Sequence, residues 1–327
     1  MNIFVVSDEG LSIVEKEGGR WTATRLLAHR HLQCVALDPH DAATIFAGSR
    51  KAGVFRSADG GRTWTRLEVP VRAVFSLAVS AASGTVYAGT EPSRLFASDD
   101  GGASWRELEG LQAIPSRPTW RFPPRPWTSH VRQIAPHPSN PDLLLVGIEL
   151  GGLMRSTDGG RTWSDHRPGA QKDVHALAWH PTHAAYAYEA GGGGAAWSRD
   201  GGRTWQAADA GRDRHYTWAL AVDPEDPDTW FVSASPSARH AHYADDARAC
   251  LYRWRGNGPW TVLRGGLPDP LGDMPTALLF AGDRLLAGFR RGAIYASPDR
   301  GDTWTSLALR GAALDGLSAM AVPRAWP

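Results

Sequence analysis

The sequence predicts an all-β fold, a single seven-bladed β-propeller that spans residues 1–327 with four strands in each blade. The first observation is a repeated octapeptide of the form Ser-x-Asp-x-Gly-x-Thr-Trp. Close copies lie at 57–64, 156–163 and 198–205, and looser copies at 98–105 and 297–304. The second is their spacing of about 40 to 60 residues, which fits one four-stranded blade. The third is that each copy lies between two short apolar runs, which is typical of a β-hairpin with an Asp/Gly turn.

The chemistry of the octapeptide is local to its turn. The Asp carboxylate accepts hydrogen bonds from backbone N–H groups, Gly takes a positive φ, and Trp covers apolar surface of a sheet. Two degenerate copies of the octapeptide end at Trp21 and Trp260. They bring the number of hairpin tryptophans to seven: Trp21, Trp64, Trp105, Trp163, Trp205, Trp260 and Trp304. We therefore interpret the repeated residues as structural and expect function elsewhere.

Two further apolar runs recur before each hairpin. The first strand of a blade is predicted at 33–39, 76–79, 133–136, 176–181, 219–224 and 277–280, and the second at 45–48, 86–89, 144–147 and 285–288. The chain begins with a second-strand pattern at 3–7 and ends with a first-strand pattern at 317–322. We predict that the C-terminal strand pairs into the first blade and closes the ring, because closure removes an exposed sheet edge.

The repeated octapeptides resemble the Asp-box, or BNR, repeat, and the chain is similar to the sialidase-like superfamily of propellers. That superfamily includes sialidases, xyloglucan hydrolases, sortilin-type receptors and photosystem II assembly factors. The resemblance implies that ligands bind on the face of the ring opposite the box turns, around the central channel. It does not imply sialidase activity, because the Arg-Ile-Pro motif of sialidases is missing and Arg121-Phe122-Pro123 is a poor echo of it.

Composition excludes several classes of function. Lys and Arg number 35 against 34 Asp and Glu, so the net charge of +1 gives no basis for binding nucleic acid or an anionic membrane. No run of 18 apolar residues predicts a membrane span. Cys34 and Cys250 are too few and too far apart for a disulfide framework. We expect a cytoplasmic monomer without a cofactor.

Alignment of the repeats places equivalent residues around the channel. The position just beyond the second strand is occupied by Asp8, Arg50, Glu91, Glu149, Glu189, Ser235 and Arg290. The start of the first strand gives Gln33, Phe75, Arg132, His175, Trp218, Thr276 and Ser318. Two residues earlier lie His31, Ala73, His130, Asp173, Tyr216, Met274 and Gly316. Polar residues of the central blades should therefore meet on one face of the ring.

From this convergence we predict a site that binds a small polar, glycoside-like ligand. Hydrolysis or another conversion of that ligand is the enzymatic version of this prediction. Glu149 and Glu189 are the candidate acid and base, with carboxylates roughly 5 to 9 Å apart if a glycosidic bond is cleaved. Arg132 would hold an anionic group and His175 would move a proton. The predicted ligand-binding residues are His130, Asp173, Tyr216, Trp218, Trp120, Arg121 and Arg290.

The alternative is a non-catalytic platform that binds a protein partner. Its basis is the long segment 117–127, in which Trp120, Arg121 and Trp127 alternate with prolines. Aromatic and Arg side chains of this kind are typical of interface hot spots. We predict no metal site, because no H-E-x-x-H or Cys/His spacing occurs. His240 and His242 would share one side of an extended segment, but a solvated loop is the simpler interpretation.

Overall fold

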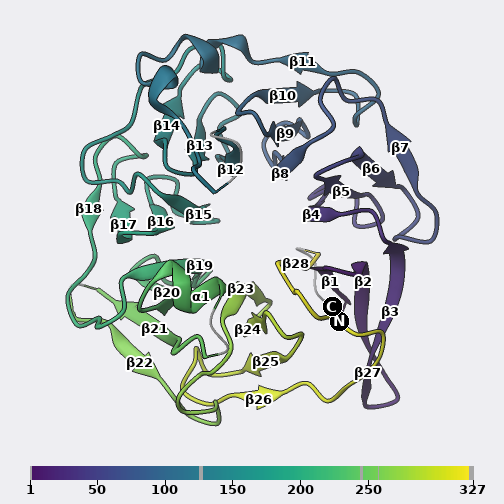
Figure 1. Cartoon of the computed structure of the whole chain (residues 1–327), viewed down its shortest axis with the longest axis vertical. Helices are drawn as coiled ribbons and strands as arrows, with labels where there is room; N and C mark the ends of the chain where they lie inside the picture. Colours follow the sequence, from purple (N-terminus) through teal and green to yellow (C-terminus); the bar gives the residue numbers. More distant parts are fainter. Residues whose placement is uncertain (1, 125–127, 244–245, 257, 324–327) are drawn as a thin grey trace.

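The computed structural model describes residues 2–124, 128–243, 246–256 and 258–323, and it is a closed ring of seven sheets (Figure 1). This confirms the predicted seven-bladed all-β propeller. The helices of the described chain are the short α1 (Ala238–His242) and two 3-10 turns, η1 (Glu109–Ala113) and η2 (Arg117–Thr119). None of them is long and apolar enough to cross a membrane.

Each blade contributes its first strand to the channel and its last to the rim. Blade 1 contains β28 (Ala319–Ala321), β1 (Asn2–Ser7), β2 (Gly10–Glu17), β3 (Arg20–Ala28) and β27 (Leu309–Gly311). Blade 2 contains β4 (Leu32–Leu37), β5 (Ile45–Ser49), β6 (Gly53–Ser57) and β7 (Thr65–Leu67). Blade 3 contains β8 (Val74–Val79), β9 (Val86–Thr90), β10 (Leu95–Ser98) and β11 (Arg106–Glu107). Blade 4 contains β12 (Val131–Pro136), β13 (Leu144–Ile148) and β14 (Gly152–Ser156).

The remaining blades follow the same order. Blade 5 contains β15 (Val174–Trp179), β16 (Ala187–Gly191), β17 (Gly194–Ser198) and β18 (Gln206–Ala207). Blade 6 contains β19 (Tyr216–Val222), β20 (Thr229–Ser235), β21 (Cys250–Arg255) and β22 (Thr261–Leu263). Blade 7 contains β23 (Pro275–Ala281), β24 (Arg284–Phe289), β25 (Ile294–Ser297) and β26 (Thr305–Ser306).

The ring closes through its two ends. β28 pairs antiparallel with β1, with Val5 opposite Met320, so the inner strand of blade 1 comes from the far end of the chain (Figure 1). This confirms the predicted closure. β27 adds an unpredicted fifth strand, parallel to β3, on the outer edge of the same blade.

Each repeated octapeptide forms the same local pattern of hydrogen bonds. In the copy at 57–64, Asp59 accepts from the Thr63 N–H and hydroxyl, and the Ser57 hydroxyl accepts from the Gly61 N–H. The indole N–H of Trp64 donates to the Gly61 carbonyl at 3.0 Å. The hydrogen bonds from the Thr63 hydroxyl and N–H, with one from the Ser57 hydroxyl, lower the pKa of Asp59 to about 2. Asp100, Asp158, Asp200 and Asp299 make the same contacts with their own turns.

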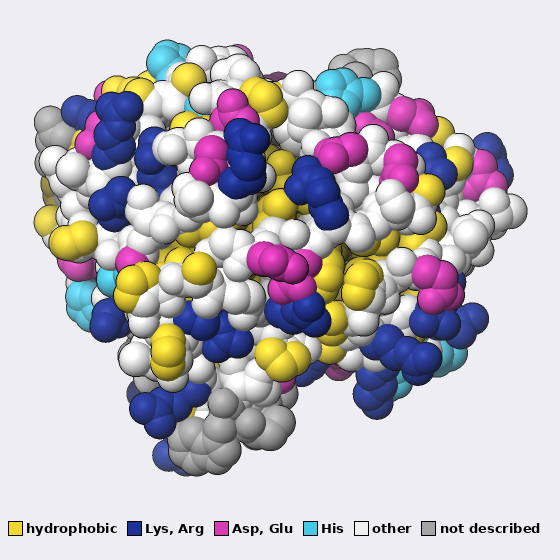
Figure 2. Space-filling model, turned by 90° about the horizontal axis from the view of Figure 1, so that it is seen from above, with side chains coloured by type: hydrophobic (Ala, Val, Ile, Leu, Met, Phe, Trp, Pro, Cys, Tyr) yellow, Lys and Arg dark blue, Asp and Glu magenta, His cyan; other side chains and the backbone are white. Residues whose placement is uncertain are grey.

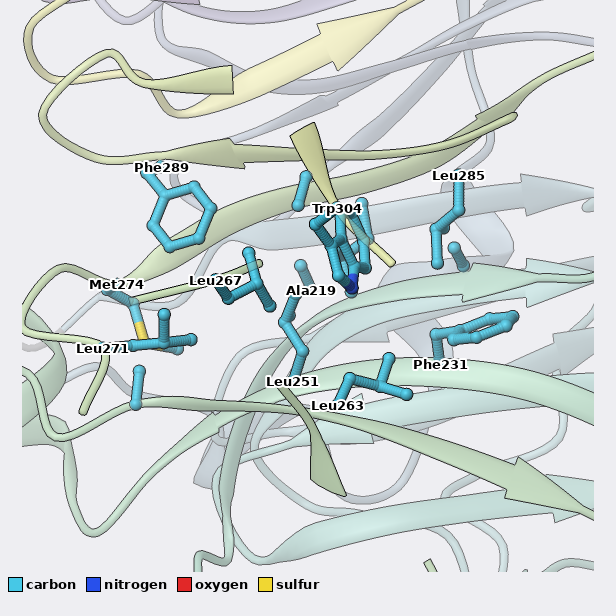
Figure 3. Packing of buried hydrophobic residues seen from close by; sticks show 14 of the residues in the cluster. Ala219, Phe231, Leu251, Leu263, Leu267, Leu271, Met274, Leu285, Phe289 and Trp304 are labelled. Atoms are coloured by element: carbon cyan, nitrogen blue, oxygen red, sulfur yellow. The ribbon is translucent and has the colours of Figure 1, made fainter. Parts of the chain in front are cut away.

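The box tryptophans pack between neighbouring blades. Figure 3 shows the interface of blades 6 and 7, where Trp304 packs among Leu251, Leu263 and Leu285. Gly301 needs its positive φ of 91°, and an added Cβ would lie 2.6 Å from Leu263. The core is therefore divided among the blade interfaces, while the side of the ring carries interspersed basic and acidic side chains (Figure 2).

Blade 4 departs from the four-stranded plan. After its box only a single bridge, Arg155 to Ser164, replaces the fourth strand. The long segment before β12 packs there: Leu111, Ile114 and Trp120 are buried in the cluster that blades 3 and 4 share. The side chain of Asp165 accepts from the backbone N–H and hydroxyl of Ser116, which fastens the segment to the outer edge.

Candidate functional site

The first strands of the blades surround a cavity of about 200 Å³ at the centre of the ring. All seven residues that alignment placed at the start of these strands line it: Gln33, Phe75, Arg132, His175, Trp218, Thr276 and Ser318. A β-bulge near the start of the first strand recurs in blades 2 to 7. The repeat alignment therefore predicted the lining of the channel correctly.

Blade 4 supplies an ion-paired carboxylate beside this cavity. Glu149 follows β13 and its Oε2 lies 2.6 Å from Nε2 of His130, which precedes β12. Nε of Arg132 lies 3.8 Å from the same oxygen. Burial raises the pKa of Glu149, but the His130 hydrogen bond and the charges of Arg132, His130 and His175 lower it to about 2. Glu149 is therefore an ionised hydrogen-bond acceptor, not an acid.

Blade 5 places a histidine against a second carboxylate. Nδ1 of His175 lies 2.6 Å from the carbonyl oxygen of Thr217, which can only accept, so Nδ1 carries a hydrogen. The other ring nitrogen, Nε2, lies 3.4 Å from Oδ2 of Asp173. Single ligand atoms of Glu149, Asp173 and His175 all lie within 4.8 Å of one another. Two blades thus bring two carboxylates and one imidazole together.

Aromatic rings of blade 6 form the neighbouring wall. The Arg132 guanidinium lies 4.5 Å from the centre of the Trp218 ring, and the centre of the His175 ring also lies 4.5 Å from that point. Tyr216 packs edge-on against His175 with ring centres 4.9 Å apart. The Trp218 ring therefore fixes the positions of the charged groups as well as lining the cavity.

His242 belongs to this wall although it was not among the predicted ligand-binding residues. Its Nε2 lies 2.9 Å from the Tyr216 hydroxyl, and Arg290 donates to its backbone carbonyl. Burial and the charges of His175, Arg290 and Arg132 lower the pKa of His242 to about 4, so the ring is neutral at pH 7. The expectation of an extended segment is wrong, because residues 238–242 form helix α1 and His240 turns back to Ser237. Ser237, which caps this helix, is the sequence signal for it.

Glu189 does not occupy the predicted position. It lies inside β16, opposite Leu177 and Ala196, and Gly192 is the residue equivalent to Glu149. The backbone shows this, because Gly192 N–H donates to the Asp173 carbonyl as Glu149 N–H does to the His130 carbonyl. Glu189 is fully buried and accepts from the Gln171 N–H at 2.8 Å. Burial raises its pKa to about 8.

The structure contradicts the stacking role that was predicted for Trp120 in segment 117–127. Trp120 is only 4% exposed, and its indole N–H donates to the Ser116 hydroxyl. The Arg117 guanidinium lies 5.4 Å from the Trp120 ring. Arg121 is exposed, and Trp127 lies outside the described residues. Trp120 therefore fills the cluster that blades 3 and 4 share and presents no stacking surface.

Comparison with known proteins identifies the fold alone. No family model and no curated protein matches the chain. A GH74 xyloglucanase from Xanthomonas campestris matches 92% of this chain at 19% identity and a TM-score of 0.69, and an ancestral GH74 enzyme matches 88% at 19% and 0.68. The chain spans 52% and 40% of the lengths of these two enzymes. YCF48 bound to D1 peptide matches 85% of this chain, and 81% of its own, at 15% identity and 0.59. The expected resemblance to such propellers is thus confirmed.

Proposed function

We propose that the protein binds a small polyhydroxylated ligand at the mouth of its channel. The binding site is the channel-mouth cluster, which consists of His130, Arg132, Glu149, Asp173, His175, Tyr216, Trp218 and His242. The observation that carries the proposal is a set of buried polar atoms for which the described residues offer no hydrogen-bond partner: Nε of Arg132, Oδ1 of Asp173 and Nε2 of His175. Buried polar atoms are rarely left unsatisfied, so donors and acceptors of this kind indicate a binding site.

The chemistry of these atoms favours hydroxyl groups. A hydroxyl both donates and accepts, so it matches a site that combines a guanidinium donor with carboxylate acceptors. The cavity of about 200 Å³ is smaller than the pockets of about 300 to 1,000 Å³ that hold drug-sized ligands. A single sugar ring or small polyol fits this size. Hydrolysis by a Glu149 and Glu189 pair is not part of the proposal, because Glu189 lies within a strand.

Ligand screening of the full chain tests this proposal. Thermal shifts with monosaccharides, sugar acids and polyols, measured with and without EDTA, should identify a stabilising class whose affinity is then determined by calorimetry. Arg132→Met should weaken binding about tenfold or more, because a hydrogen bond to a charged group contributes roughly 1.5 to 3 kcal/mol. Arg161→Met, an exposed box residue of the same blade, is the matched control. Absence of any hit, or equal affinity in the Arg132→Met protein, would contradict the proposal.

A second candidate is recognition of a protein segment at the same rim. Among the described residues the exposed large hydrophobic side chains are Leu150 and Tyr243, 41% and 79% exposed, and they directly follow Glu149 and His242. Leu150 is held at a φ of 57°, which non-glycine residues rarely adopt. YCF48, which shares the fold, is bound to a peptide. A peptide array probed with wild-type protein and with the Leu150→Asp, Tyr243→Ala double variant decides this: only binding that the double variant loses supports it.

A further inference from the structure

Two carboxylates and one imidazole converge at the channel mouth with the donor set of a metal centre. We infer that Glu149, Asp173 and His175 bind one divalent transition-metal ion, of the class of Zn²⁺, Mn²⁺ or Co²⁺. Their ligand atoms lie within 4.8 Å of one another, and Glu149 and His175 are buried while Asp173 is partly buried. This deepens the proposed function, since the ion would belong to the same cluster, but metal binding is measurable without any other ligand.

His175 carries the argument. Its side chain is fully buried, and its Nδ1–H is committed to the Thr217 carbonyl. Metal-binding histidines almost always donate their second ring nitrogen in this way, which fixes the tautomer and aims the other nitrogen. Nε2 has no hydrogen-bond partner among the described residues and faces Asp173. A neutral imidazole would therefore direct a lone pair at a carboxylate, which is unfavourable unless a cation lies between them.

A protonated His175 paired with Asp173 is the alternative arrangement. Hydrogen bonds between a charged N–H and a carboxylate are about 2.7 to 2.9 Å long, whereas this contact is 3.4 Å. Zinc binds His nitrogen and carboxylate oxygen at about 2.0 to 2.2 Å, so ligand atoms on opposite sides of one ion are roughly 4.3 Å apart at most. In tetrahedral coordination the ligand atoms are about 3.4 Å apart, so the spread of up to 4.8 Å needs a closure of roughly 0.5 to 1.4 Å. The contact is too long for a charge-assisted hydrogen bond and suits an intervening ion.

The absence of a side chain at Gly192 leaves room for the Asp173 carboxylate in this cluster. Gly192 occupies the blade 5 position that Glu149 holds in blade 4, and a Cβ there would lie 2.0 Å from Oδ2 of Asp173. Any side chain at Gly192 would displace the Asp173 carboxylate. Three protein ligands leave coordination positions open, as in catalytic zinc sites, and mixed imidazole and carboxylate ligands suit first-row transition metals. A hydroxyl of the proposed ligand could complete the coordination.

Metal uptake by the EDTA-stripped full chain tests the inference. We expect calorimetry with Zn²⁺ and Mn²⁺, and the visible absorption of Co²⁺, to report one ion per chain. His175→Ala and Asp173→Asn should each weaken binding about tenfold or more, and Gly192→Ala should weaken it through displacement of Asp173. His240→Ala, on the same helix as His242 but directed to Ser237, is the control and should bind as wild type does. Circular dichroism verifies that each variant is folded.

Each outcome is decisive. The inference is overturned if the stripped wild-type chain takes up no ion at millimolar concentrations of metal, or if folded His175→Ala and Asp173→Asn proteins bind as tightly as wild type. Loss of metal binding in His240→Ala would indicate that the ion binds at helix α1 and would also overturn the inference. If sugars or polyols bind in EDTA while the stripped chain takes up no metal, the proposed function stands and the metal site is overturned. If the chain takes up metal but no sugar or polyol binds, the metal site stands and the proposed function is overturned.

Discussion

Glu189 is a carboxylic acid in the interior of blade 5. It is fully buried between β15 and β17, and the Gln171 N–H is the hydrogen-bond donor that reaches it. Burial raises its pKa from the ordinary value of 4.5 to about 8, so the folded protein keeps its proton at pH 7. An ionised carboxylate at this place would cost much more than a neutral one. Glu189 therefore makes the stability of the blade depend on pH.

The sign of this dependence gives a first prediction. Between pH 4.5 and about 8 the folded state holds the Glu189 proton while the unfolded state has lost it, so stability decreases as pH rises through this range. Glu189→Gln keeps a neutral side chain of the same shape. We expect equal stability of the two proteins near pH 4 and an advantage of the variant near pH 9 on the order of a few kcal/mol, measured by urea unfolding.

The exposed Glu68 provides a matched control, because Glu68→Gln should leave this difference unchanged. Parallel stability curves for wild type and Glu189→Gln across the whole pH range would contradict the prediction. The contrast also bears on the site, since a buried neutral acid in a strand cannot form the second carboxylate of a channel-mouth pair.

The misplacement of Glu189 in the sequence alignment has a physical cause. Arg132, His175 and Trp218 were placed correctly because counting back from the Pro after each first strand fixes their register. Around Glu189 the run of glycines after β16 offers several equivalent alignments. The β-bulge between Val174 and Ala176, together with the Gly192 N–H bond, selects one of them. Because Gly191–Gly194 carry no side-chain pattern, an offset of three residues could not be detected from the sequence.

At the scale of elements, the box turns hold the outer hairpins. In blade 4 the Asp158 carboxylate accepts from the Thr162 N–H and hydroxyl and from the Ser156 hydroxyl. Burial raises the pKa of Asp158, but these hydrogen bonds and the charge of Arg161 lower it to about 2. Each turn thus uses a charged acceptor to satisfy backbone groups that the strands leave unpaired.

We therefore predict that Asp158→Ala lowers the free energy of unfolding by about 1 to 3 kcal/mol at neutral pH, the range for an unsatisfied polar group. The folded pKa of about 2 lies below the ordinary value of 3.8, so this stabilisation is present above pH 3.8 and is lost as pH falls through 2. The difference in the free energy of unfolding between wild type and Asp158→Ala should therefore disappear in acid. Chemical unfolding at several pH values measures it, and Thr157→Ala at the exposed second box position is the control. A gap that persists at pH 2 would exclude the carboxylate as its source.

Elements built from local turn chemistry were predictable, and elements that depend on distant segments were not. The hairpins follow from the Asp/Gly turn and the alternating runs beside it. The fourth strand of blade 4 fails to form although its box is intact, because η1, η2 and Trp120 occupy that edge and Asp165 binds Ser116. Helix α1 likewise depends on its place against blade 6, where His242 meets Tyr216. These two contacts join residues 26 and 49 positions apart and carry no periodic signal.

At the scale of the whole molecule, closure of the ring creates the site. The cavity is lined by the first strand of every blade, so its shape depends on all seven inner strands at once. Blade 1 obtains its inner strand from β28, whose Ser318 N–H also donates to the Val6 carbonyl. The sequence predicted this because its two ends carry complementary parts of one blade pattern. The chemistry at the axis could not be predicted in the same way, since it depends on contacts between side chains from three blades.

The last prediction concerns this closure. A chain that ends at Gly316 lacks Leu317, which is 1% exposed, and the whole of β28. Loss of this burial should lower stability by roughly 3 kcal/mol or more, and the uncovered edge of β1 should pair with other chains. We expect a lower melting temperature together with oligomers in size-exclusion chromatography with light scattering.

A permuted chain separates closure from covalent order. Residues 312–323 placed before Asn2 through a short Gly/Ser linker, in a chain that ends at Gly311, restore the inner strand in the order that the other six blades already have. This protein should melt like wild type and remain monomeric, because the strand pairing is intact and only its connection differs. If the truncated chain is as stable as wild type, β28 does not hold the ring. If the permuted chain is as unstable as the truncated one, the pairing of β28 with β1 depends on the covalent path through β27, which lies beside β3 on the outer edge of the same blade.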